Sequence, residues 1–174
     1  MSTRTHLFSS ILIASLFARP VLAQQPEKDG AGIIVSGKAS AQDVGLPFYP
    51  GSTPRKDNSD DSQAARLGLW GGGSGFKLAV VKMNSADSPD RVAAFYKKAL
   101  AKYGKVFDCS YASASSGEDK NSNALTCGDD KPDPGGMLFK SGSKEKQHMV
   151  SVQPNGTGSS YDLVAVGNWS SKNH

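Results

Sequence analysis

Residues Ser88 to Gly104 read SPDRVAAFYKKALAKYG, and this stretch decides the fold. Its apolar side chains recur at steps of three and four residues, which predicts a helix with a single apolar stripe. Ser88 is a good N-cap, because its hydroxyl can accept a bond from a free first-turn amide. Pro89 suits the first helical position, where its missing N–H costs nothing, and Gly104 ends the helix. The stripe consists of Val92, Phe95, Tyr96, Ala99, Leu100 and Tyr103.

A helix with one apolar stripe must pack on another element, and the rest of the chain offers strands. Phe76–Met83 (FKLAVVKM) is the clearest early strand and places Phe76, Leu78 and Val80 on one face. Weaker or later candidates are residues 32–35, 65–70, 105–111, 125–127, 137–140, 147–153 and 161–169, with turns expected at 71–75, 141–143 and 154–158. This order predicts an α+β fold, in which an antiparallel sheet carries one amphipathic helix on one face.

The first 23 residues have the layout of a secretory signal peptide. Arg4 precedes the mostly apolar run Leu7–Phe17, and Val21-Leu22-Ala23 places small or compact residues before a cleavage site after Ala23. As a helix, that run would reach only about 16 Å, roughly half of a bilayer core, so we expect no membrane anchor after cleavage. We therefore expect a flexible mature N-terminus at 24–44, a single α+β domain at 45–170, and export to the periplasm or the extracellular medium.

The mature chain is close to neutral. Two of the 20 basic side chains, Arg4 and Arg19, leave with the signal peptide, so 18 basic and 16 acidic side chains remain. The basic residues alternate with acidic and apolar ones and form no block. Because nucleic-acid binding needs a concentrated positive footprint, we expect no nucleic-acid partner.

The chain has two cysteines, Cys109 and Cys127. An even pair of cysteines in an exported protein is typical of a disulfide. The alternative, a reactive thiol, would need a histidine partner and a reducing compartment. Closing a loop between residues this far apart stabilises a fold by about 3 kcal/mol in the chain-entropy model. We therefore predict a Cys109–Cys127 disulfide.

No catalytic, metal or cofactor motif is found in the sequence. After signal cleavage the histidines are His148 and the terminal His174, and no Gly-x-Ser-x-Gly elbow accompanies them. His148 shares a predicted strand face with Val150 and Val152, which favours a packed or edge residue over a catalyst. The acidic segment 57–61 resembles half of a calcium loop but lacks the glycine and the glutamate that such a loop requires. We predict no catalytic residues, no metal site and no cofactor.

Trp70 and Trp169 are the candidate ligand-binding residues. Both stand near the ends of predicted strands, where an indole can stack on a sugar or another flat ligand. The alternative interpretation is that each packs in the core or at its rim.

Three motifs resemble a known group of proteins. Tyr49-Pro50-Gly51, the run Asp87–Tyr96 and Leu100–Gly104 form the pattern YPG … DSPxxVxxFYxxxLxxYG. This pattern resembles small exported bacterial proteins of unknown function and covers roughly residues 46–109. The resemblance implies bacterial export and an α+β fold, and no activity or functional residue comes with it.

Our leading hypothesis is a non-enzymatic envelope or secreted module that binds a ligand or a protein. It predicts an exposed apolar or aromatic patch on the sheet face away from the helix, to which Trp70 or Trp169 would contribute. A second hypothesis is an extracytoplasmic hydrolase built around His148 with a nearby serine or carboxylate. A third is a purely structural or stress-protective envelope protein without a small ligand.

Overall fold

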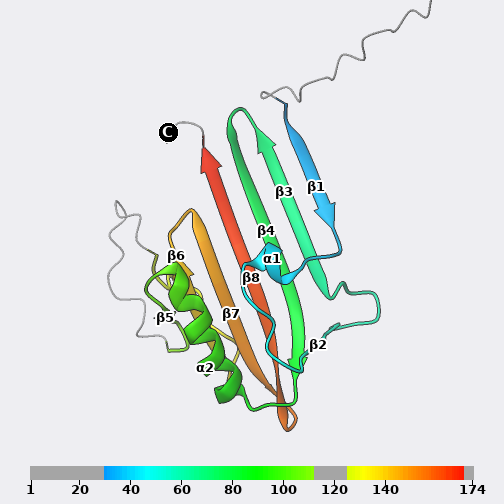
Figure 1. Ribbon diagram of the computed structural model, residues 1–174, viewed down its shortest axis with the longest axis vertical. Helices are drawn as coiled ribbons and strands as arrows, with labels where there is room; N and C mark the ends of the chain where they lie inside the picture. Colours follow the sequence, from blue (N-terminus) through cyan, green and yellow to red (C-terminus); the bar gives the residue numbers. More distant parts are fainter. Residues whose placement is uncertain (1–29, 112–124, 171–174) are drawn as a thin grey trace, which may run out of the picture.

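The computed structural model describes residues 30–111 and 125–170, and of Trp169 only the backbone. The predicted signal peptide, residues 24–29 and the terminal His174 lie outside these residues. One large, open antiparallel sheet dominates the described part and carries one main helix, so the predicted α+β class is confirmed in outline, although the helix is small (Figure 1).

The sheet has a simple order. From one edge to the other the strands run β1-β3-β4-β8-β7-β6-β5, and β2 pairs with the C-terminal end of β4. Their bounds are β1 Gly32–Ser36, β2 Thr53–Pro54, β3 Ala64–Gly71, β4 Ser74–Ser85, β5 Phe107–Asp108, β6 Met137–Gly142, β7 Lys146–Asn155 and β8 Gly158–Ser170. The helices are α1 Ala41–Val44, α2 Pro89–Leu100 and the 3₁₀ turn η1 Ala101–Tyr103.

Two tight hairpins build the centre of the sheet. β3 and β4 are joined through Gly72 and Gly73, which have φ angles of 56° and 76°. Positive φ at both central residues is what a twisted hairpin requires, and glycine adopts it without a steric penalty. β7 and β8 are joined through Gly156 and Thr157. The turns predicted at 71–75 and 154–158 are thus confirmed.

The predicted helical stripe is confirmed. Val92, Tyr96 and Leu100 are fully buried, and Phe95, Ala99 and Tyr103 pack against the same core. Pro89 is the first residue of α2, and Gly104 follows η1 with a φ of 120°. The Ser88 hydroxyl makes no capping bond, contrary to expectation. The amides of Arg91 and Val92 donate to the Ser88 carbonyl, as is ordinary for the residue that precedes a helix.

α2 covers β6, β7 and β8, and α1 lies over β4 and β8, so the two helices lie on the same side of the sheet (Figure 1). We call this side the helix face and the opposite side the far face. The helix face holds the buried sheet residues of the core, namely Ala79, Val81, Met83, Phe139, Val150, Val152, Tyr161, Leu163 and Ala165. Phe76, Leu78 and Val80 do share one face, as predicted, but it is the far face.

The YPG and DSP motifs meet in space. The Tyr49 hydroxyl donates to Asp87 Oδ2 at 2.7 Å, and the Tyr49 ring packs edge-on against Phe95. The Tyr49 amide donates to the hydroxyl oxygens of Tyr96 and Tyr161, at 3.0 and 3.2 Å. These motif residues therefore tie the segment before β2 to α2 and β8, which is a structural role.

Three expectations about local structure were wrong. Of residues 105–111, only Phe107–Asp108 form a strand. Beyond them the Leu138 amide donates to the Ser110 hydroxyl and not to a backbone carbonyl, so the ladder of strand hydrogen bonds ends. Leu125 and Cys127 are buried, but residues 125–127 form no strand, and the disulfide fixes Cys127. Ser141 and Gly142 belong to β6, and the turn is closed by mutual backbone bonds of Ser143 and Lys146. Of the predicted N-terminal segment 24–44, the structure describes 30–44. This part contains β1, which confirms the possible strand there, and α1, which has a complete capping box from Ser40 and Asp43.

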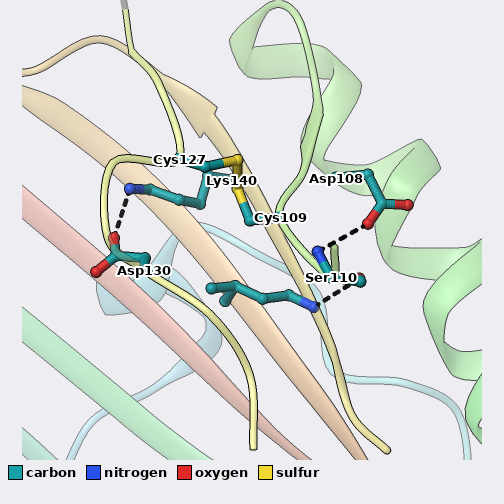
Figure 2. The surroundings of a disulfide bond; sticks show 7 residues. Asp108, Cys109, Ser110, Cys127, Asp130 and Lys140 are labelled. Atoms are coloured by element: carbon teal, nitrogen blue, oxygen red, sulfur yellow. Dashed lines mark hydrogen bonds and ion pairs between the residues drawn. A yellow bond between two sulfur atoms is a disulfide. The ribbon is translucent and has the colours of Figure 1, made fainter. Parts of the chain in front are cut away.

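The predicted disulfide is present. Cys109 and Cys127 are bonded, with their Cα atoms 5.5 Å apart, and both are buried. Beside them Lys140, which is only 4% exposed, donates to Asp130 at 2.6 Å (Figure 2). The bond and the ion pair together fasten the segment after residue 124 to β6.

Within 30–111 and 125–170, the longest helix is far too short and polar to cross a bilayer.

Candidate functional site

The two predicted ligand-binding tryptophans occupy related positions. In the register of the sheet, Trp70 of β3 and Trp169 of β8 flank Gly75 of β4, and all three are helix-face positions. The Trp70 side chain is 39% exposed and its ring lies over Gly32, where a Cβ would clash with it. Trp70 also lines a shallow hollow of about 420 Å³ at the turn that joins β3 and β4. The ligand role of both residues stays a prediction.

Two lysines occupy the next helix-face row. Lys77 of β4 and Lys146 of β7 flank Gly167 of β8. This row lies two residues from the Trp70–Gly75–Trp169 row. Because Gly167 has no side chain, nothing from β8 separates the two lysine stems.

His148 lies on the same face, one row further along, opposite Ala165. Its ring stacks on Tyr103 with 3.5 Å between the ring centroids. Its Nδ1 atom is 3.0 Å from the Val44 carbonyl oxygen. Since a carbonyl oxygen only accepts, Nδ1 carries the proton, and the ring is fixed in one orientation.

The charges around His148 are mostly positive. Burial lowers the pKa of His148 below its ordinary value, and the ammonium groups of Lys102 and Lys77 lower it further, while the bond to the Val44 carbonyl acts in the opposite direction. The carboxylate on this side, Asp43, is engaged by Ser40 and Arg66, whose hydrogen bonds lower its pKa. We expect His148 to be neutral at pH 7.

A groove connects these groups. It has a volume of about 640 Å³ and lies between α1, η1 and the strands β4, β7 and β8. We call it the basic groove; its lining includes Lys77, Tyr103, Lys146, His148, Ala165 and Gly167. Its volume falls within the range of small-molecule sites.

The hydrolase interpretation receives no support from this geometry. The serine opposite His148 in the register is Ser141, which is fully buried, and its Oγ has no hydrogen-bond partner in the described part of the chain. A nucleophile with no access to solvent and no bond to its base is not activated for attack. His148 instead uses Nδ1 to bind the backbone, as the interpretation of it as a packed residue predicts.

The far face carries a continuous apolar surface. Leu67, Leu78 and Val166 are cross-strand neighbours, and so are Val80, Val164 and Met149. We call the whole set the far surface: Ile33, Val35, Leu67, Leu69, Phe76, Leu78, Val80, Met149, Val164 and Val166. The patch predicted on this face therefore exists, but the two tryptophans belong to the opposite face.

The exposure of the far surface increases toward β1. Its central members are half-buried, Leu69 is 37% exposed, and Ile33 and Val35 of the edge strand are 70% and 77% exposed. At the other end, Arg55 binds Asp162 at 2.6 Å and both Arg55 and Lys82 contact Asp57. The far surface is thus apolar from its centre to the β1 edge, and a rim of charged side chains borders it at the opposite end.

Comparisons with protein-family models, with curated proteins and with solved structures gave no match for this chain.

Proposed function

We propose that this protein is a non-enzymatic, exported binding module of the cell envelope or the medium, and that its far surface binds a protein partner. The observation that carries the proposal is the apolar register of β1, β3, β4, β8 and β7 on the face that neither helix covers. In a folded domain each apolar face of a sheet is normally buried against a second layer. A contiguous apolar face with a polar rim is typical of an interaction site.

The size of the far surface suits a reversible complex. Completing the burial of ten partly exposed apolar side chains would contribute on the order of 10 kcal/mol. Association itself costs about 4–15 kcal/mol. We therefore expect moderate affinity and a partner whose polar groups also meet the rim formed by Arg55, Lys82 and Asp162.

Export is the second part of the proposal. It is supported by the signal-peptide layout of residues 1–23 and by the Cys109–Cys127 disulfide, because such bonds persist in oxidising compartments. The resemblance of the YPG and DSP motifs to exported bacterial proteins points in the same direction.

Site-specific photo-crosslinking in intact cells tests the proposal. A photo-reactive phenylalanine derivative placed at Leu78 or Val166 should give a cross-link to one defined envelope or secreted protein. The same group at Lys98, an exposed position on α2, should not give that product. No cross-link from either far-surface position would overturn the proposal. A product containing two copies of this chain would overturn it as well, because the far surface would then be a dimer interface.

A control separates binding from folding. Val80→Lys adds a charge to the half-buried centre of the far surface. It should abolish the cross-link from Val166 while purified protein keeps the circular dichroism spectrum of the parent. An unchanged cross-link in this variant would contradict the proposed contact.

A further inference from the structure

The basic groove on the helix face combines two lysines with a gap between them. Lys77 and Lys146 stand on either side of Gly167, so their Cα atoms are two strand spacings, about 10 Å, apart. A Cβ at Gly167 would come within 3.1–3.2 Å of carbons of the Lys77 side chain, so the Lys77 stem already lies over this glycine. The ammonium groups of both lysines can therefore reach a common atom in the groove.

Like charges placed this close repel each other unless an anion lies between them. The other charged groups that face the groove do not supply one. Lys102 of η1 is a further cation beside Tyr103, and the carboxylate of Asp43 on α1 is bound by Arg66. Within the described residues, the lining of the groove thus has an excess of positive charge.

The remainder of the groove is suited to a flat group. Ala165 has a small side chain and Gly167 is covered by the Lys77 stem, so the open part of the groove lies on the side of His148 and Tyr103. One wall is the fixed stack of His148 on Tyr103. A planar body can lie against this aromatic wall while a charged head lies between the lysines.

We propose that the basic groove binds a small organic anion, with a carboxylate held between Lys77 and Lys146 and a flat apolar body lying against the stacked rings of His148 and Tyr103. This site is on the opposite side of the sheet from the far surface. It therefore goes beyond the proposed function, and either one can fail without the other.

Titration of the mature chain with benzoate, followed by NMR and calorimetry, tests the proposal. Benzoate should bind saturably, shift the ring resonances of His148, and bind more tightly than acetate, which lacks the flat body. Its uncharged analogue benzamide should bind at least tenfold more weakly, because it forms no charge-assisted bonds with the lysines. Equal binding of benzoate and benzamide, or of benzoate and acetate, would overturn the proposal.

Single substitutions locate the site. Lys77→Gln and Lys146→Gln should each weaken benzoate binding by about tenfold, the usual effect of losing one charge-assisted hydrogen bond. Lys98→Gln, which removes the same charge from the outer side of α2, should leave it unchanged. An equal loss in all three variants would show that benzoate responds to net charge alone, and no loss in the first two would place it elsewhere; either result contradicts the assignment.

The pH dependence gives an independent check. A carboxylate near His148 stabilises the protonated ring, so benzoate should raise the pKa of His148. By linkage, benzoate affinity should increase as the pH falls from 8 toward the pKa of His148, and His148→Gln should remove this part of the dependence. An unchanged His148 titration at saturating benzoate would overturn the proposed placement.

Discussion

The Tyr96 hydroxyl is the polar group on which the packing of α2 most depends. The side chain is fully buried, and its hydroxyl donates to the Pro47 carbonyl at 3.1 Å and accepts from the Tyr49 amide. Because the hydroxyl is buried, the pKa of Tyr96 is raised well above its ordinary value. This one atom therefore links the helix to the segment that precedes β2.

Replacing Tyr96 with phenylalanine should lower the free energy of unfolding by about 0.5–1.5 kcal/mol, the usual contribution of one hydrogen bond. The aromatic ring and its packing remain, but the Pro47 carbonyl loses its partner. Urea unfolding of the mature chain measures the change. Tyr111→Phe serves as the control, since Tyr111 is 74% exposed and should unfold at the parental midpoint. Equal midpoints for Tyr96→Phe and the parent would show that the bond contributes nothing.

The roles of proline and cysteine, which constrain the backbone covalently, could be predicted from the sequence. The polar contacts of individual side chains could not. Pro89 at the start of α2 and the Cys109–Cys127 pair follow from local chemistry. The burial of Lys140 could not be predicted, because it depends on Asp130 and on a segment that the disulfide folds back over β6. The missing capping bond of the Ser88 hydroxyl could not be predicted either, because it depends on the direction from which the chain enters α2.

Elements with a periodic pattern and local contacts were predicted best. α2 and the β3–β4 and β7–β8 hairpins form between neighbours in the chain, so their signals lie within a few residues. The short β5 and the irregular segment at 125–127 depend on pairing with β6 and on the disulfide, and their apolar residues resemble those of a strand.

The two faces of β4 provide a prediction at the scale of an element. Val81 is buried on the helix face, and its neighbour Val80 is half-buried on the far face. Val81→Ala should therefore cost about 2 kcal/mol, since it removes buried carbons and leaves a cavity. Val80→Ala, the same substitution one residue earlier, should cost less than about 1 kcal/mol. Denaturant unfolding of the two variants decides the matter, and a larger loss for Val80→Ala would reverse our assignment of the faces.

At the scale of the whole molecule, the sequence predicted an apolar patch opposite the helix, but the residues expected to contribute to it, Trp70 or Trp169, occupy helix-face positions. β3 and β4 carry apolar side chains on both faces, so alternation alone does not say which face α2 covers. The register decides: it aligns Leu67, Leu78 and Val166 on the far face and places Trp70 with Gly75 on the other. For the same reason the basic groove, whose lysines come from β4 and β7, had no signal in the sequence.

The disulfide lies at the β5–β6 edge, away from both the basic groove and the β1 end of the far surface (Figures 1 and 2). Replacing Cys109 and Cys127 together with alanine should lower the free energy of unfolding by about 3 kcal/mol, because the unfolded chain regains the freedom of an 18-residue loop. The helix and sheet should persist, since the core formed by α2, β4, β7 and β8 contains neither cysteine. Guanidinium unfolding with and without dithiothreitol measures this: the reductant should weaken the parent to the level of the variant and leave the variant unchanged. If the variant and the oxidised parent unfold at the same denaturant concentration, the bond does not stabilise the domain, and its support for export is lost as well.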